Sequence, residues 1–118
     1  MSNHYILDEN GEVKEVDNVL EWADWFEKNP DRHIGYTSIF GIRVSTVFLG
    51  LDYSFSMGLS HAPILWETMI FGGINDQYQE RYATREEAIS GHRRAVFLVL
   101  KSLPRELLSK FSKKKDEE

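Results

Sequence analysis

The sequence predicts an α+β domain of order β-β-α-β-β-β-α, in which two helices pack on an antiparallel sheet of about five strands. Three observations predict this class. Residues 4–16 hold two short segments around Asn10-Gly11, a pair that supplies the positive φ angles of a tight hairpin turn. Residues 34–71 are rich in β-branched and aromatic residues, as expected for a meander. Two further segments carry apolar residues at helical spacing, so helices can cover the sheet.

The first helix is expected over residues 19–28. Asp17 or Asn18 caps it, and Asn18 with Glu21 forms a capping-box pattern. Pro30 follows its end, because proline cannot continue the hydrogen-bond ladder. The residues on one face of this helix are Val19, Trp22, Ala23 and Phe26.

Three strands are expected next. Gly41 separates the first two, where a tight turn is needed. A mobile loop over residues 52–63 is expected before the third. The predicted strands are Ile34–Phe40, Ile42–Leu51 and Ile64–Phe71.

The last long helix begins at Thr84, which forms a second capping box with Glu87. Pro104 is expected to break this helix. A short amphipathic turn over 105–111 and a charged, disordered tail over 112–118 are expected to follow. The face expected toward the sheet carries Ala88, His92, Ala95, Val96, Val99 and Leu103.

A core and a dimer interface follow from these elements. Phe97, Leu98 and Leu100 exceed what one buried helix face requires, so we expect a homodimer through this helix. The residues expected in the core are Trp22, Phe26, Val44, Phe48, Ile70, Ala95 and Val99.

Composition limits the class of protein further. A chain of 118 residues suits one domain, expected over residues 1–111. The absence of cysteine excludes disulfides, thiolate metal sites and cysteine nucleophiles. A net charge of −5 argues against general nucleic-acid binding. No apolar run is long enough for a membrane span and no basic-then-apolar leader opens the chain, so neither a membrane span nor a signal peptide is expected.

The sequence favours neither a metal or cofactor site nor a catalytic set. No HExxH motif or equivalent metal-ligand spacing of histidines occurs. His92 is expected to be a hydrogen-bonded core residue beneath the last helix. Ser45, His92 and Glu67 offer the residue types of a triad, but no nucleophile-elbow motif supports them, and the serine also suits an ordinary strand. Catalysis is therefore left open, with no catalytic residue assigned.

Polar groups that converge beside the sheet are the better-motivated candidate. Arg81 and Arg85 flank the start of the last helix, where free amides favour anions. Two alternatives compete with this site: Arg43 pairs with Glu67 across the sheet, and Arg85 pairs with Glu86 or Glu80 in solvent. The candidate ligand-binding residues are Arg43, Trp66, Glu67, Tyr78, Arg81, Arg85 and His92.

Four strings of the sequence carry a resemblance. They are VSTVFLGLD at 44–52, LWETMIFGG at 65–73, RYATREEA at 81–88 and GH at 91–92. With these motifs, residues 22–96 resemble a family of small uncharacterised proteins encoded by bacteriophages and prophages. The chain departs from the family at Tyr53, where the family often has histidine. The resemblance implies a phage accessory protein in the bacterial cytoplasm, and it brings no catalytic residues.

Three functions are weighed on these grounds. The first is a non-enzymatic antagonist of bacterial defence that sequesters a small anionic, nucleotide-like ligand. The second is an acidic protein that binds and blocks a host protein, such as one that binds nucleic acid. The third is a small hydrolase. Sequestration requires arginines that converge on a concave site, blocking requires a contiguous acidic or apolar patch, and catalysis requires two titratable groups within hydrogen-bond reach.

Overall fold

The structure is a computed structural model that describes residues 3–54 and 62–116, with side chains described as far as Leu108 in the last helix. The middle of the loop predicted over 52–63 lies outside the described residues, as do residues 117–118. The elements are β1 (Tyr5–Leu7), β2 (Val13–Glu15), α1 (Val19–Lys28), β3 (His33–Ile39), β4 (Ile42–Phe48), β5 (Trp66–Phe71), β6 (Gln79–Tyr82) and α2 (Arg85–Asp116).

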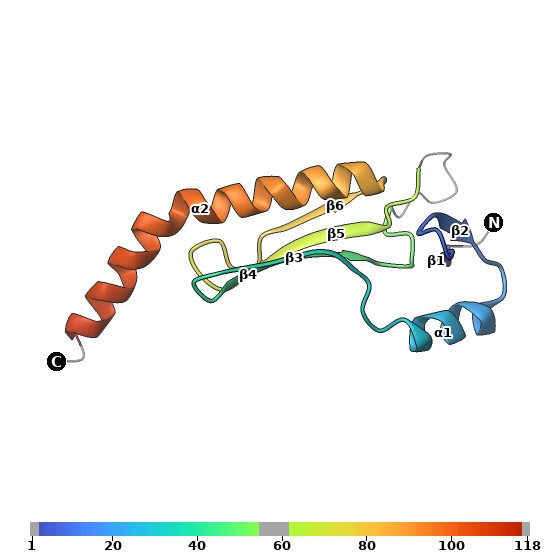
Figure 1. The fold of residues 1–118 in the computed structure, drawn as a ribbon, viewed down its shortest axis with the longest axis horizontal. Helices are drawn as coiled ribbons and strands as arrows, with labels where there is room; N and C mark the ends of the chain where they lie inside the picture. The colour runs from blue at the N-terminus through green and yellow to red at the C-terminus, as the bar shows by residue number, and fades with distance from the viewer. Residues whose placement is uncertain (1–2, 55–61, 117–118) are drawn as a thin grey trace.

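The α+β class is confirmed, with two antiparallel sheets in place of one. The larger sheet has the strand order β3-β4-β5-β6, and β1 pairs with β2 in a separate hairpin. Figure 1 shows α2 along one face of the larger sheet, with the hairpin and α1 beyond one end of it. The strand β6 was not expected, because its sequence Gln-Glu-Arg-Tyr is polar. It is an edge strand that pairs only with β5, where polar residues are tolerated.

The predicted caps and turns form. Asn18 is the N-cap of α1, and its side chain accepts hydrogen bonds from the amides of Leu20 and Glu21. Thr84 and Glu87 form the reciprocal capping box of α2, with both distances 3.1 Å. These local signals fixed the helix starts because each satisfies amides that have no partner within the helix.

The core consists of two clusters along the α2 side of the sheet. One joins Ile42, Val44 and Ile70 to Ala95 and Val99 of α2. The other contains Phe48, Leu65, Trp66, Tyr82 and Ala88. Five of the seven predicted core residues are therefore buried.

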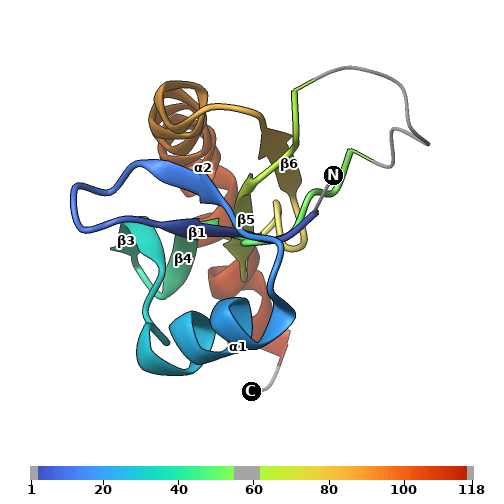
Figure 2. The same ribbon diagram turned by 90° about the vertical axis from the view of Figure 1, so that its right-hand side faces the viewer.

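The expectation that Trp22 and Phe26 are core residues is wrong, because α1 has no buried residue. Both side chains are half-buried. Trp22 donates from Nε1 to the carbonyl of Gly50 at 3.0 Å. The helix lies at the end of the sheet (Figure 2), so it covers less apolar surface than a helix that crosses a sheet face.

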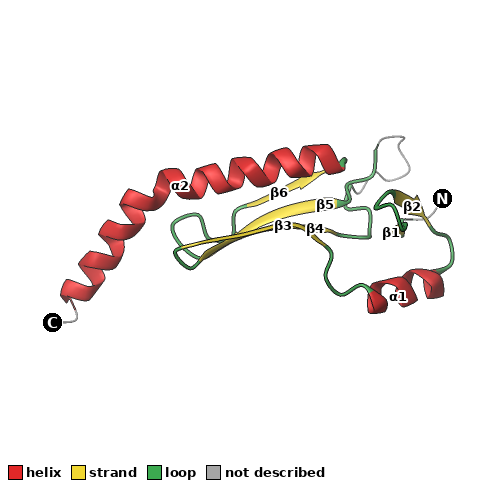
Figure 3. Cartoon of the chain, viewed as in Figure 1, coloured by secondary structure: helices red, strands yellow, loops and turns green. Residues whose placement is uncertain are grey.

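Helix α2 does not end at Pro104, and this prediction is also wrong. The helix continues to Asp116, through part of the segment predicted to be a disordered tail. Buried Glu106 accepts a hydrogen bond from the amide of Ile74 in the β5–β6 loop. This contact joins the helix to the β5–β6 loop two residues beyond the proline. Figure 3 shows α2 as a helix that is uninterrupted along its length. Figure 1 shows α2 bending along its length, and an interior proline is a known cause of such a bend.

Charge is segregated along the molecule, which measures 59 × 30 × 23 Å. Residues 1–31 carry nine acidic and two basic side chains, whereas α2 carries four acidic and nine basic ones. The acidic segment lies at one end of the long axis and the C-terminus of α2 lies at the other (Figure 1). Among the described residues, no helix is long and apolar enough to cross a membrane.

Candidate functional site

Side-chain alternation divides the predicted ligand-binding residues between the two faces of the sheet. Trp66 faces α2 and is 1% exposed, so its ring has no free face for a ligand to stack on. Its strand neighbour Glu67 points to the opposite face, as does Arg81 in the paired position of β6. His92 approaches the sheet from α2. Trp66 therefore lies on the other face of the sheet from Arg81, but it lines a cleft at the start of α2 together with Arg85.

The predicted pairing of Arg43 with Glu67 is wrong. Glu67 accepts a hydrogen bond from Nε of Arg81 at 2.8 Å. Arg43 pairs in register with Phe71, and its guanidinium lies 5.4 Å from the centre of that ring. Because Trp66 pairs with Phe48, Arg43 is five strand positions away, about 17 Å.

Two further predicted ligand-binding residues, Tyr78 and Arg85, lie beside carboxylates. Tyr78 donates to Glu80 at 2.7 Å, and Glu80 also accepts from Arg94 at 2.8 Å. The hydrogen bond to Glu80, with burial, raises the pKa of Tyr78 to about 12.

Arg85 lines a cleft of about 300 Å³ together with Glu86 and Glu12. The two glutamates at that cleft oppose the binding of an anion beside Arg85.

His92 is a hydrogen-bonded residue beneath α2, as the sequence predicts. Its Nε2 lies 2.9 Å from Oγ1 of Thr37, and its Nδ1 lies 2.7 Å from Oγ1 of Thr46. Thr46 in turn is bonded to buried Thr68 at 2.6 Å. Burial lowers the pKa of His92. Both ring nitrogens are occupied by threonines, which leaves His92 no free nitrogen for a ligand.

A second histidine forms an array that the sequence did not reveal. Nε2 of His33 lies 3.0 Å from Oγ of Ser45, and Nδ1 of His33 lies 2.8 Å from Oδ1 of Asp31. Asp31 also accepts a hydrogen bond from the His33 amide at 3.1 Å. These contacts lower the pKa of Asp31, chiefly through the side-chain hydrogen bond to His33. This is the connectivity of a nucleophile, a base and a carboxylate that orients the base.

The array contains Ser45, which the sequence suggested as part of a triad with His92 and Glu67. In the structure His92 is bonded to threonines and Glu67 to Arg81, and the partners in the array are His33 and Asp31. The signal was the Asp-x-His spacing at the start of a strand, which lets one side chain accept from the backbone and the ring of the other. The serine lies on the sheet face away from α2, paired in register with exposed Tyr36.

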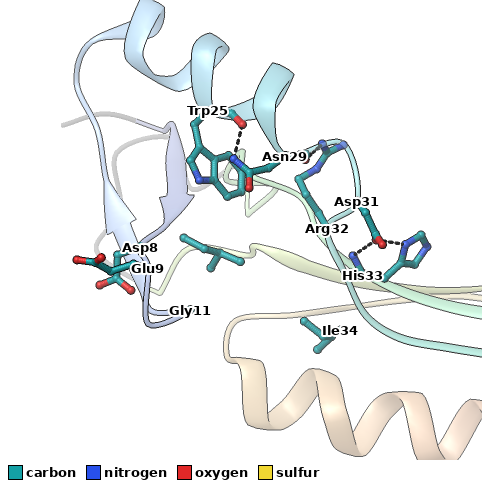
Figure 4. A pocket seen from close by; sticks show the side chains of 10 residues that line it. Asp8, Glu9, Gly11, Trp25, Asn29, Asp31, Arg32, His33 and Ile34 are labelled. Carbon is teal, nitrogen blue, oxygen red and sulfur yellow. Dashed lines mark hydrogen bonds and ion pairs between the residues drawn. The ribbon is translucent and has the colours of Figure 1, made fainter.

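Beside the array is a cleft of about 480 Å³ between the hairpin tip, the end of α1 and the start of β3 (Figure 4). Trp25 and Ile34 give it apolar walls, and it is lined by the carboxylates of Asp8, Glu9 and Asp31. Arg32 also lines it, but its guanidinium donates to the carbonyl of Asn29 and lies 4.0 Å from the Phe26 ring centre.

The chemistry of this cleft favours a cation. Acidic residues outnumber arginine three to one among those that line it. Asp8 accepts from the amides of Asn10 and Glu12, and Asp31 is bonded to His33, so Glu9 is the acidic lining residue with no such bond. The C-terminal end of α1 adds the negative end of its dipole. An indole beside carboxylates suits a guanidinium or ammonium group. A metal ion is not indicated, since no group of three or more metal-ligating side chains occurs among the described residues.

Comparison with protein-family models, with curated proteins and with solved structures found no match to this chain.

Proposed function

We propose that this protein acts by binding another protein and blocking a basic surface of it. The observation that carries this proposal is the segregation of charge: residues 1–31, which include the hairpin and α1, hold nine acids and two bases at one end of an elongated molecule. Such a patch attracts a positively charged partner and speeds association with it.

The cleft supplies the specific contact within this acidic end. Asp8 and Glu9 lie at the hairpin tip on one side of the cleft and Asp31 lies on the other, with Trp25 between them (Figure 4). An arginine or lysine side chain of the partner fits these walls, because its charge meets carboxylates while its stem and cation lie against the indole. A small anion would meet three negative charges at the same place, so the geometry favours blocking over nucleotide sequestration.

The resemblance to phage-encoded proteins indicates what kind of partner to expect. A phage accessory protein acts on proteins of the infected bacterium, in its cytoplasm, and a nucleic-acid-binding defence protein has the basic surface that the acidic end complements. Occupying that surface would keep nucleic acid from it, since both ligands compete for the same arginines and lysines.

A titration with a short arginine-rich peptide tests the cleft. Wild type should bind the peptide in low salt and lose affinity as salt rises. Asp8→Asn with Glu9→Gln should weaken binding by about threefold to tenfold. The matched control neutralises Glu86 and Glu87 at the start of α2, which should leave affinity unchanged. Equal weakening in both pairs of variants would point to net charge alone, and absence of binding would contradict the proposal.

We also propose that α2 joins two copies of the chain. Exposed apolar residues lie along this helix; those described are Phe97, Leu100, Leu107 and Leu108. Phe97, Leu100 and Leu107 are separated by three and then seven residues, which places them on one face, as in paired helices. Leu98, assigned to this interface from sequence, packs instead against the core.

The apolar sequence pattern is symmetric about Pro104. Leu100 and Leu108 lie four residues on either side, and Phe97 and Phe111 lie seven residues on either side. A two-fold axis at Pro104 would therefore bring like residues together in an antiparallel pair. This arrangement also keeps the acidic ends of the two copies apart.

The chain lacks cysteine, so single substitutions can report on this pairing. Phe97→Glu should give a folded monomer by light scattering. A mixture of Leu100→Cys and Leu108→Cys chains should form a mixed disulfide, whereas Phe97→Cys alone should not link to itself. A monomeric wild type at tens of micromolar, or ready self-linking of Phe97→Cys, would contradict the antiparallel dimer.

A further inference from the structure

We propose that Ser45 is a nucleophile for acyl transfer, with His33 as its general base and Asp31 as the residue that positions the base. The proposal rests on the two hydrogen bonds that connect the three side chains, 3.0 Å from Ser45 to His33 and 2.8 Å from His33 to Asp31. It also rests on the cleft that His33 and Asp31 line. A nucleophile bonded to a base, a base bonded to an orienting group and an adjacent concave site together define a candidate catalytic centre.

The position of Ser45 suits this role. It lies on β4 with its side chain on the face that α2 does not cover, and it is 9% exposed. Tyr36 of β3 is the register partner of Ser45, and the centre of the Tyr36 ring lies 5.6 Å from that of the His33 ring. The exposed phenol of Tyr36 therefore lies on the same face of the sheet as Ser45, and a hydroxyl is a group that can donate to a developing oxyanion.

The reaction is hydrolysis of a carboxylic ester in two steps. Oγ of Ser45 bonds to the carbonyl carbon as its proton passes to Nε2 of His33. The bond to the leaving alcohol then breaks, and the alcohol oxygen takes that proton. In the second step water attacks the acyl-serine, again giving a proton to His33. The carboxylic acid leaves, and Oγ of Ser45 recovers its proton.

The cleft indicates which esters are preferred. Asp8 and Glu9 line the same cleft as His33 (Figure 4). Ser45 does not line the cleft itself but is bonded to His33, so an ester with a cationic side chain would place its charge at the carboxylates and its carbonyl beyond His33 at Ser45. This substrate class rests on the cation cleft proposed above, whereas the nucleophile itself does not.

Diisopropyl fluorophosphate is the probe for the nucleophile, because it phosphorylates an activated serine and releases fluoride. Intact-mass spectrometry should show one adduct on wild type, and peptide mapping should place it on Ser45. Ser45→Ala should abolish the adduct and His33→Ala should slow its formation by about 100-fold or more. Ser38→Ala, which removes another serine from β3, should leave labelling unchanged. Circular dichroism of each variant shows whether it is folded.

Rescue by a conservative variant separates positioning from structure. The Asp31 carboxylate is hydrogen-bonded to Nδ1 of His33, so Asp31→Ala should slow labelling of Ser45 because the imidazole loses the group that orients it. Asp31→Glu, which keeps a carboxylate, should restore part of the rate. Labelling of Asp31→Ala at the wild-type rate would contradict the role of Asp31.

Ester hydrolysis tests the substrate preference, and labelling tests the nucleophile, so the two can fail separately. Wild type should hydrolyse an arginine ester faster than the matching norleucine ester, and Asp8→Asn should reduce the difference. Labelling of Ser45 without any preference for arginine would keep the nucleophile and overturn the cation cleft. No labelling of wild type, or equal labelling of Ser45→Ala, would overturn the nucleophile.

Discussion

His92 Nδ1 lies 2.7 Å from Oγ1 of Thr46, and this contact joins α2 to the central strand of the sheet by a hydrogen bond inside the apolar layer. The opposite ring nitrogen reaches Thr37 on the neighbouring strand at 2.9 Å. One imidazole thus ties the helix to two strands. A buried polar group is tolerated when its partners are present, and its removal leaves them unsatisfied.

Replacement of His92 by alanine should lower the free energy of unfolding by about 1–3 kcal/mol, through lost packing and unpaired threonine hydroxyls. Urea denaturation measures the change. The control is Arg93→Ala, one residue along on the exposed side of α2. Equal, small effects of the two substitutions would show that the network adds nothing to stability.

The same histidine predicts how stability depends on pH. Burial lowers the pKa of His92 in the folded protein below its ordinary value near 6.5. The unfolded chain therefore takes up a proton first as the pH falls. The contribution of His92 is fully present above pH 6.5 and declines as the pH falls from there through the folded-state pKa. Denaturation at several pH values should show a smaller decline for His92→Gln than for wild type.

Position 35 is predicted to require glycine because the His92 imidazole lies directly against it. A Cβ at position 35 would lie 2.8 Å from Nδ1 of His92, closer than real contacts allow. Gly35→Ala should cost about 1–3 kcal/mol of stability through overpacking. In the His92→Ala background most of that cost should disappear, which a double-mutant cycle measures directly. Additive effects would mean that Gly35 is needed for another reason.

Tyr78 should titrate far above the range of an ordinary tyrosine. Its pKa rises to about 12, first because its hydroxyl donates to Glu80 and then because it is partly buried. The hydrogen bond contributes stability below pH 10, and that contribution is lost between pH 10 and 12. The same bond lowers the pKa of Glu80. Tyr78→Phe should raise the pKa of Glu80 in a carboxyl NMR titration; an unchanged value would assign the shift to Arg94 instead.

The parts of the fold that the sequence predicted are those with local causes. Asn18 and Thr84 begin helices because their own side chains satisfy nearby amides. The two longest predicted strands, 42–51 and 64–71, correspond to β4 and β5. They were predicted because β-branched and aromatic residues are concentrated there, with turn residues at their ends. Pro104 shows the limit of such reasoning: its local preference is outweighed by a contact between Glu106 and Ile74, 32 positions apart in the chain.

The array at Ser45 could not be predicted for a related reason. Strict alternation would place His33 and Gly35 on the same face of β3. A register shift between them pairs His33 with Val47 and Gly35 with Thr46, so they face opposite sides. That irregularity turns His33 toward Ser45 while Gly35 makes room for His92. A bulge re-aims side chains in this way, and periodicity alone does not reveal it.

The anchor of α2 beyond Pro104 supplies the last prediction. Glu106 is 7% exposed, and its carboxylate accepts a hydrogen bond from the Ile74 amide. A Cβ at Gly73 would lie 2.6 Å from the same carboxylate oxygen, so the loop fits closely around it. Glu106→Ala should cost about 1–3 kcal/mol and leave the Ile74 amide without its acceptor.

Hydrogen exchange at the Ile74 amide measures this effect at one atom, and urea denaturation measures it for the whole chain. Exchange should become faster in Glu106→Ala but change little in Leu107→Ala, since Leu107 is exposed on the outer side of α2. If this contact holds α2 beyond Pro104, the helical content should also fall in Glu106→Ala. The last turns of α2 would then lose the described hydrogen bond that joins them to the β5–β6 loop. Unchanged exchange at Ile74 would show that another contact carries the helix past the proline.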